Sequence, residues 1–205
     1  MTGAGDTLEI MTGTLYITGE TDADELLNND GNALLIGMLL DQQVPMEWAF
    51  KGPATLRARL GHLDPTKIAE MDVDEFVAVC ADKPAIHRFP GSMGKRIHAV
   101  CTALVDDYQG DARNLWRGVD DGSELYKRLK ALPGFGDEKS KIFVALLAKT
   151  QGVSPAGWQK AAGKFGDDTP RSVADIHDEA SLHEVRAWKK AQKAAKKDKQ
   201  DRPVD

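Results

Sequence analysis

Leu132-Pro133-Gly134-Phe135-Gly136 lies between two segments in which apolar residues recur at helical spacing. Leu125 and Leu129 belong to the first segment, and Ile142 and Leu146 belong to the second. Proline limits how far the first helix can extend, and glycine adopts a positive φ at little cost. These residues predict a helix that ends near residue 131, a tight hairpin, and a second helix that starts near residue 137.

Such a hairpin leaves backbone N–H groups unpaired at the start of its second helix, where the helix dipole also favours an anion. One phosphate group fits such a site. A turn that binds no ligand explains the same Pro-Gly-x-Gly pattern, because short glycine turns are common between helices. The pattern alone therefore leaves both interpretations open.

The composition indicates a mostly helical protein without membrane segments. Its 205 residues suffice for one large domain or two small ones, and charged residues are frequent while aromatic residues are few. The longest apolar run, residues 33–40, is shorter than the ~18 residues that a membrane span needs. No basic region followed by an apolar stretch marks an export signal, so we expect a cytoplasmic protein.

Cysteine usage and net charge limit the classes of site. Cys80 and Cys101 are the only cysteines, and both lie on apolar sides of predicted helices, so we expect buried free thiols. Two cysteines cannot ligate a four-thiolate iron–sulfur cluster. The net charge of −5 argues mildly against nucleic-acid binding. Lys139, Lys141 and Lys149, after the hairpin, form either a basic stripe or an ordinary solvated helix face.

Apolar periodicity predicts an all-α chain. A helix at residues 33–43, capped by Asn32, is apolar nearly all round, which is typical of a central helix. An exposed, mobile loop is expected at residues 82–94, and an extended lead-in at residues 15–19. Other helices are expected at residues 20–27, 46–60, 65–71, 73–81, 93–108, 111–118, 124–131, 155–165, 173–176 and 181–197.

The Leu-Pro-Gly-Phe-Gly hairpin, followed by a helix that carries Lys139 and Ser140, resembles the helix-hairpin-helix of the HhH-GPD superfamily of base-excision DNA glycosylases. The resemblance covers about residues 32–165. It implies that Gly134 and Gly136 present amides to a DNA phosphate, with Phe135, Lys139 and Ser140 in the same DNA-binding stretch. It also implies that hairpin carbonyls hold a monovalent cation, with no other cofactor or metal.

A second stretch, Asp41-Gln42-Gln43-Val44-Pro45, is similar to the glutamine-containing segment that approaches the lesion in that superfamily. By this resemblance, Gln42 and Gln43 contact DNA and help to fill the gap left by a flipped base. The alternative is that the two amides pair the carbonyl groups at the end of the preceding helix.

The usual catalytic residues of the superfamily are missing. Its catalytic aspartate follows a valine after the hairpin helix, where this chain has Val153-Ser154, and its catalytic lysine corresponds to Glu138. Asp41 is therefore the first candidate for the carboxylate and Glu47 the second, although Asp41 could simply bind neighbouring backbone. Trp48 and Trp158 are candidates for stacking on a flipped base, or else core residues.

The resemblance implies two helical subdomains, residues 44–149 with the hairpin and residues 1–43 plus 150–205, with double-stranded DNA across their cleft. We expect a nucleoid-associated monomer that acts as a monofunctional DNA N-glycosylase. An alkylated base is the expected substrate, because it leaves easily. The alternatives are a non-catalytic DNA-binding module and a helical scaffold for protein contacts. The lysine-rich segment at residues 189–197 is either a packing helix that frays or an added DNA-backbone contact.

Overall fold

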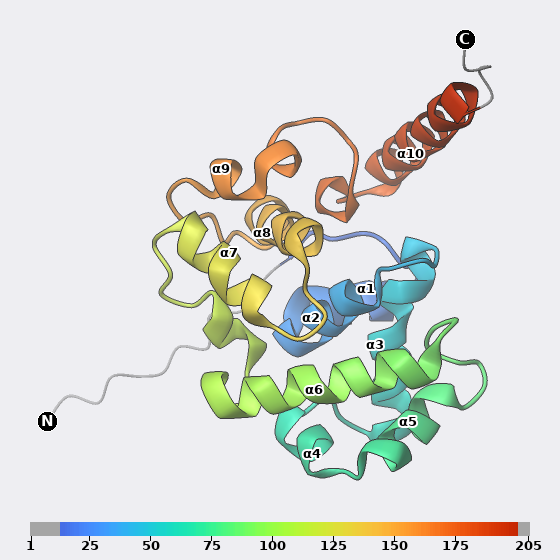
Figure 1. Cartoon of the computed structure of the whole chain (residues 1–205), viewed down its shortest axis with the longest axis vertical. Coiled ribbons are helices and arrows are strands. Elements are labelled where there is room, and N and C mark those ends of the chain that lie inside the picture. Colours follow the sequence, from blue (N-terminus) through green and yellow to red (C-terminus); the bar gives the residue numbers. More distant parts are fainter. Residues whose placement is uncertain (1–12, 201–205) are drawn as a thin grey trace, which may run out of the picture.

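The computed structural model describes residues 13–200, with side chains up to residue 195, and contains helices without β-strands over that range (Figure 1). The all-α prediction is confirmed. The α-helices are α1 (Thr21–Asn29), α2 (Gly31–Leu40), α3 (Met46–Leu60), α4 (Pro65–Glu70), α5 (Val73–Ala81), α6 (Pro90–Tyr108), α7 (Gly122–Ala131), α8 (Asp137–Thr150), α9 (Trp158–Ala162) and α10 (Glu179–Gln200). Short 3-10 helices are η1 (Ala112–Leu115), η2 (Gly163–Gly166) and η3 (Val173–Asp175).

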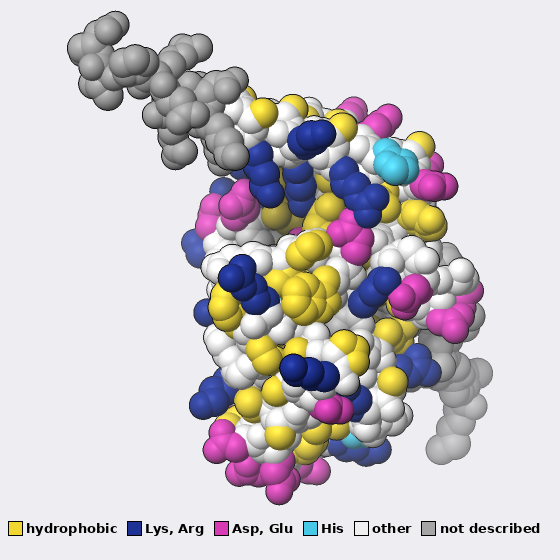
Figure 2. Space-filling view, turned by 90° about the vertical axis from the view of Figure 1, so that its right-hand side faces the viewer, with side chains coloured by type: hydrophobic (Ala, Val, Ile, Leu, Met, Phe, Trp, Pro, Cys, Tyr) yellow, Lys and Arg dark blue, Asp and Glu magenta, His cyan; other side chains and the backbone are white. Residues whose placement is uncertain are grey.

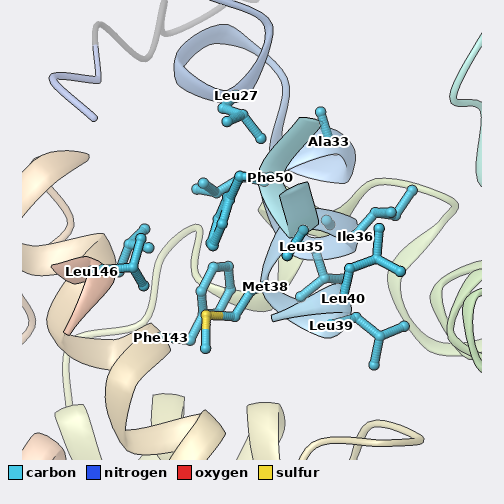
Figure 3. Close-up of a cluster of buried hydrophobic side chains, with 14 of the residues drawn as sticks. Leu27, Ala33, Leu35, Ile36, Met38, Leu39, Leu40, Phe50, Phe143 and Leu146 are labelled. Carbon is cyan, nitrogen blue, oxygen red and sulfur yellow. The ribbon is translucent and has the colours of Figure 1, made fainter. Parts of the chain in front are cut away.

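Helix α2 is the centre of the fold, as its all-round apolar sequence predicts. Every residue of α2 except Asn32 is buried. Figure 3 shows its side chains surrounded by Leu27 of α1, Phe50 of α3, and Phe143 and Leu146 of α8. Because α2 has no solvent-facing side, its apolar surface is removed from water in all directions, which stabilises the whole core.

The other helices pack in two groups, with α2 between them (Figure 1). On one side α6 packs against α4 and α5, and on the other α8 packs against α7, α9 and η3. Helix α2 contacts α1, α3, α6 and α8, so one continuous core links both groups. The division into subdomains at residues 44 and 149 stays a prediction.

Several element boundaries differ from the sequence-based expectations. Asp30, not Asn32, caps α2, since its carboxylate accepts hydrogen bonds from the backbone N–H of Asn32 and Ala33. The Asn32 side chain instead accepts a hydrogen bond from the N–H of Ala112. Helix α2 ends at Leu40, three residues earlier than expected. Helix α9 covers only Trp158–Ala162 of the expected longer helix, because the chain turns at Gly163 into η2.

The segment at residues 82–94 is not an exposed loop throughout. Helix α6 begins at Pro90, which is well suited to a first helical position. Before it, Ile86 and His87 are buried, with 1% of each residue exposed. The extended lead-in at residues 15–19 is confirmed, and Leu15 and Ile17 are buried there without a partner strand among the described residues. Cys80 and Cys101 are buried free thiols, as expected.

None of the helices traced between residues 13 and 200 combines the length and the apolar character that crossing a membrane requires.

Substitution of Gly37 in α2 tests how tightly the central helix is packed. A Cβ atom at this position would lie 2.8 Å from Cδ1 of Phe50 and 3.3 Å from a methyl group of Leu27. Alanine favours a helix over glycine by about 1 kcal/mol, but overpacking a core costs about 1–3 kcal/mol. We expect Gly37→Ala to lower the free energy of unfolding in urea by about 1 kcal/mol.

Gly91→Ala in α6 is the matched control, because its Cβ would meet nothing nearer than 4.0 Å. This variant should be as stable as the wild type or slightly more stable. A Gly37→Ala protein more stable than the wild type would show that the helices can separate at little cost.

Candidate DNA-binding hairpin and catalytic groove

The hairpin at residues 132–136 connects α7 to α8 as predicted, but its two glycines have different roles. Gly134 has φ +79°, and a Cβ there would lie 2.9 Å from Cδ1 of Leu39. Gly136 has φ −86° and ψ −179°, an extended conformation open to any residue, with no atom within 4 Å of its Cβ position. Only Gly134 is therefore required by the backbone.

The start of α8 has the features of an anion site. No side chain of the described residues caps this end of α8, so its first N–H groups face solvent. Asp137 and Glu138 in the first turn are paired with Lys141 at 3.0 Å and Lys164 at 3.4 Å. Each carboxylate thus has a cationic neighbour, which partly offsets its repulsion of an anion at the start of the helix, and phosphate binding there stays a prediction.

The hairpin carbonyl groups fit the predicted monovalent cation. The carbonyl oxygens of Pro133, Gly134 and Phe135 accept no hydrogen bond from any residue that the structure describes. Unpaired carbonyl oxygens are suitable ligands for a hard cation. The cation itself stays a prediction. No group of three His, Cys, Asp or Glu side chains among residues 13–195 is arranged to hold a metal ion.

Two residues expected to contact DNA have buried side chains. Phe135 is 5% exposed and packs against Phe143 with ring centroids 6.1 Å apart. Ser140 is fully buried, and its hydroxyl donates to the carbonyl of Gly136 at 2.9 Å. Both side chains hold the hairpin in place, and neither is positioned to reach a phosphate.

Lys139 joins the hairpin helix to the end of α2. Its ammonium donates to the carbonyl oxygens of Met38 and Leu39, both at 2.7 Å, and lies 3.4 Å from that of Asp41. Burial lowers the pKa of Lys139 to about 8, although Asp41 acts in the opposite direction. The expectation that Lys139 faces a phosphate or solvent is corrected, because its protons pair the last carbonyl groups of α2.

The sequence left open whether the two glutamines after α2 contact DNA or pair the last carbonyl groups of the helix, and the structure gives the two residues different surroundings. Gln42 donates from Nε2 to the carbonyl of Leu39 at 2.9 Å and accepts from Arg96 at 2.8 Å. The imidazole of His87 donates from Nε2 to the carbonyl of Gln42 at 3.0 Å. Gln43 is exposed with φ +58°, and its side chain makes no hydrogen bond to any described residue. Gln42 thus fixes the turn, while Gln43 is free to reach a ligand.

A groove of about 880 Å³ lies between this turn and α10. Residues 41–47 form one wall, and Arg186, Lys189, Lys190 and Lys193 form the other. Asp41 and Glu47, the two predicted catalytic candidates, both line it. The sequence predicts for this lysine-rich segment either a packing helix that frays or an added DNA-backbone contact, and neither interpretation places it beside Asp41. The signal was nevertheless present, because residues 186, 189, 190 and 193 have the i, i+3, i+4, i+7 spacing of one helix face.

The two carboxylates differ in charge environment. Burial raises the pKa of Asp41, and the cations Lys189 and Lys139 only partly oppose this effect. The Asp41 carboxylate accepts no hydrogen bond and forms no ion pair with any described residue. Burial also acts to raise the pKa of Glu47, but a hydrogen bond from its own backbone and the contact with Arg186 outweigh it, so this pKa is lowered. Glu47 is therefore occupied, and Asp41 is the free carboxylate.

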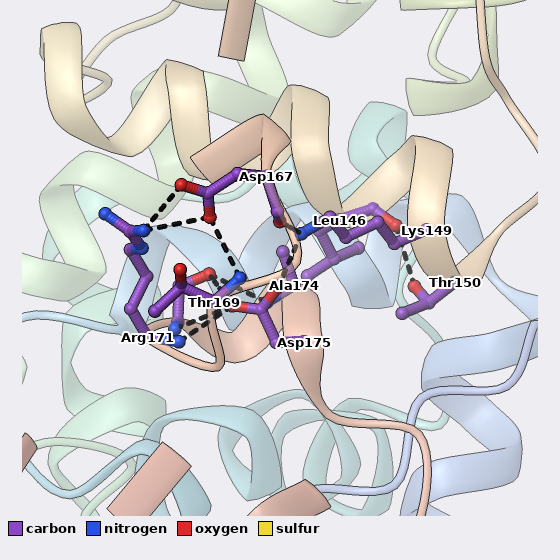
Figure 4. Close-up of polar contacts among 9 residues, drawn as sticks. Leu146, Lys149, Thr150, Asp167, Thr169, Arg171, Ala174 and Asp175 are labelled. Atoms are coloured by element: carbon purple, nitrogen blue, oxygen red, sulfur yellow. Dashed lines mark hydrogen bonds and ion pairs between the residues drawn. The ribbon is translucent and has the colours of Figure 1, made fainter. Parts of the chain in front are cut away.

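Contacts from its own first half and from the segment before it hold α10 over the groove. In the groove, Arg186 pairs with Glu47, and Lys189 lies 2.7 Å from the sulfur of Met46. Outside it, the segment that leads into α10 is anchored by the polar contacts in Figure 4. There Lys149 binds Asp175 at 2.6 Å, and Asp175 accepts two backbone N–H groups, while Arg171 pairs with Asp167 at 2.6 Å.

Ser154 and the two tryptophans expected to stack on a flipped base lie outside the groove. Ser154 is exposed in the connection between α8 and α9 and makes no side-chain hydrogen bond to the described residues. Trp48 is on the surface, 40% exposed, with its indole N–H bound to the carbonyl of Ala85 at 3.2 Å. Trp158 packs against the core beside α7. The structure therefore does not place either tryptophan beside Asp41 as a wall of a base pocket.

A family model matches most of the chain. The model of a family described as "HhH-GPD superfamily base excision DNA repair protein" matches residues 36–202. No curated protein and no solved structure matches the chain at a significant level. The matched range includes the hairpin, the wall at residues 41–47 and the whole of α10.

The pH dependence of stability tests the placement of Lys139. A solvated lysine in the unfolded chain keeps its proton to a higher pH than Lys139 with its pKa of about 8. Above about pH 8, the unfolded state then binds more protons, so the free energy of unfolding gains up to roughly 1.4 kcal/mol per pH unit from this group. We expect this gain in the wild type and its loss in Lys139→Met, measured by urea unfolding between about pH 7 and pH 10.

Other groups that titrate between about pH 7 and pH 10 contribute equally to the stability of the wild type and of Lys139→Met, so the difference between the two profiles reports Lys139. Lys67→Met, at an exposed position of α4, should keep the wild-type pH dependence. Parallel pH profiles for the wild type and Lys139→Met would place the ammonium in solvent instead.

Proposed function

The chain belongs to the HhH-GPD superfamily of base excision DNA repair proteins, and on this premise we propose that it is a monofunctional DNA N-glycosylase that excises a damaged base from duplex DNA. One observation carries the proposal: a free carboxylate, Asp41, lies in a groove at the end of the central helix. Hydrolysis of an N-glycosidic bond needs such a group close to the sugar.

The proposed mechanism uses groups at three places. The unpaired N–H groups of Gly134 and of residues 136–138 bind a backbone phosphate, and Gln43 contacts the duplex at the flipped position. The flipped nucleotide enters the groove, where the C1′–N bond breaks and the base leaves with the bonding electron pair. A water molecule adds to the sugar cation at C1′, and its proton passes to the Asp41 carboxylate. The base takes up a proton from solvent.

The Lys139 contact supports this assignment of roles. Lys139 is three residues beyond the hairpin and holds the backbone at Met38, Leu39 and Asp41. A phosphate bound at the hairpin is thus connected through one side chain to the segment that carries Asp41. Rigid connection of this kind positions a catalytic group relative to its substrate.

A second candidate function is DNA binding without base excision. Ser154 favours it, since this residue stands where the resemblance implies a catalytic aspartate. The class of base is a separate question. Leaving-group chemistry alone favours an alkylated base, whereas the charge of the groove favours another class.

Base release from damaged duplexes tests the proposal directly. We expect the wild type to release a free base, detected by mass spectrometry, and Asp41→Asn to be slower by roughly 10²–10⁴-fold. The rate should fall as the pH decreases through the Asp41 pKa, because the carboxylate must be ionised to accept a proton. Burial raises that pKa, so the fall should lie above the usual range of an aspartate.

Lys189→Met removes a cation that lowers the Asp41 pKa. In this variant the fall in rate with decreasing pH should therefore begin at a higher pH than in the wild type. Asp168→Asn, at an exposed position, is the control and should keep the wild-type rate and profile. No release above the spontaneous rate by the wild type, with duplex binding intact, would establish the non-catalytic module.

Gly136 allows a test of the hairpin that does not disturb folding. Its backbone is extended and its Cβ position is open, so Gly136→Glu should fold normally and place a carboxylate at the phosphate site. We expect duplex binding to weaken at least about tenfold, as measured by fluorescence anisotropy at several salt concentrations. Gly136→Ala should bind like the wild type. Equal affinity of all three proteins for duplex DNA would exclude the hairpin as the phosphate site.

A further inference from the structure

We propose that the groove selects damaged bases that are uncharged and carry carbonyl oxygens, such as oxidised or deaminated bases, and rejects bases that alkylation has made cationic. The inference rests on the proposed function, because it concerns what enters the groove beside Asp41. It reverses the expectation of an alkylated substrate that leaving-group chemistry alone supports.

The charges of the groove are unequal. Four cations, Arg186, Lys189, Lys190 and Lys193, face two carboxylates, Asp41 and Glu47. Arg186 and Glu47 form an ion pair and cancel each other. The groove then has three lysines, Lys189, Lys190 and Lys193, and one carboxylate, Asp41, outside that ion pair. Figure 2 shows Lys and Arg side chains gathered along the upper rim of a hollow on this face of the molecule.

These cations belong to the groove because α10 is fixed there. Leu182 and Val185 bury the first turns of the helix in the core, and Arg171 lies over the Trp188 ring at 5.7 Å. Lys190 and Lys193 are exposed and make no hydrogen bond to any residue between 13 and 195. Their ammonium groups are therefore available to a molecule that enters.

A cationic base would find no favourable partner in this groove. Enclosing a cation requires an aromatic face or a free carboxylate. Among the described residues that line the groove, none is aromatic. The single free carboxylate, Asp41, is outnumbered by lysines, and like charges repel strongly in a partly desolvated site. A methylated purine cation is thus disfavoured on entry.

An uncharged base with carbonyl groups gains from the same charges. When the C1′–N bond breaks, such a base carries away the electron pair and becomes an anion, with the charge spread onto its carbonyl oxygens. Ammonium groups that donate to these oxygens stabilise the developing charge in the transition state. A base that is already cationic leaves as a neutral molecule and receives no such help. The lysines therefore act on both binding and bond cleavage.

Single-turnover base release on matched duplexes tests the inference. One set of duplexes carries a single uracil, hypoxanthine or 8-oxoguanine, and the other carries N7-methylguanine, each corrected for spontaneous release. We expect the wild type to release at least one of the first set faster than N7-methylguanine. Lys190→Gln and Lys193→Gln should each reduce this ratio of rates by about fivefold, as expected for one exposed unit charge a few Å from the base. Lys67→Gln on α4 is the control and should leave the ratio unchanged.

The other outcomes are distinguishable. Release of N7-methylguanine in preference to the carbonyl-bearing bases would overturn the inference and leave the proposed glycosylase function standing. Equal loss of rate on every duplex in the lysine variants, with a smaller salt dependence, would also overturn it, because the lysines would then bind only the DNA backbone. No release of any base by the wild type would refute the proposed function itself.

Discussion

The last carbonyl groups of a helix that is buried on every side have to be paired within the protein. Helix α2 meets this constraint with an ammonium group. Lys139, about a hundred residues later in the chain, binds the carbonyls of Met38 and Leu39, and the amide of Gln42 adds a second bond to Leu39. Burying a charged amine is unfavourable, and this desolvation is the main reason why the pKa of Lys139 is lowered.

This way of ending α2 brings the hairpin and the groove together. Lys139 lies in the first turn of α8, so the same helix start that has N–H groups available for a phosphate also holds the backbone at Asp41. Arg96 of α6 binds the side chain of Gln42, and His87, before α6, binds its carbonyl oxygen. The turn at residues 41–43 is therefore clamped by side chains from α8, from α6 and from the segment before α6. A site built in this manner is rigid where chemistry needs precision.

Helix α10 contributes charge rather than core to the same place. Its buried core residues, Leu182 and Val185, lie in its first turns, whereas Lys190 and Lys193 line the groove with exposed side chains. The ion pair between Arg186 and Glu47 removes one carboxylate from use and leaves Asp41 as the free one. The net charge of the chain is negative, yet this face is locally positive. Local placement of charge, not the total, decides what the groove can bind.

Local sequence determined much of this protein. Apolar periodicity and turn residues are properties of neighbouring positions, so the all-α class, the hairpin at residues 132–136, the central α2 and the family were accessible from the sequence. Tertiary structure alone decided the partners of Lys139, the burial of Ser140 and Phe135, and the meeting of α10 with Asp41. The spacing that puts Arg186, Lys189, Lys190 and Lys193 on one face was readable, but not the surface that this face would meet. Such pairings depend on how helices far apart in sequence pack, and side-chain spacing within one helix carries no information about that.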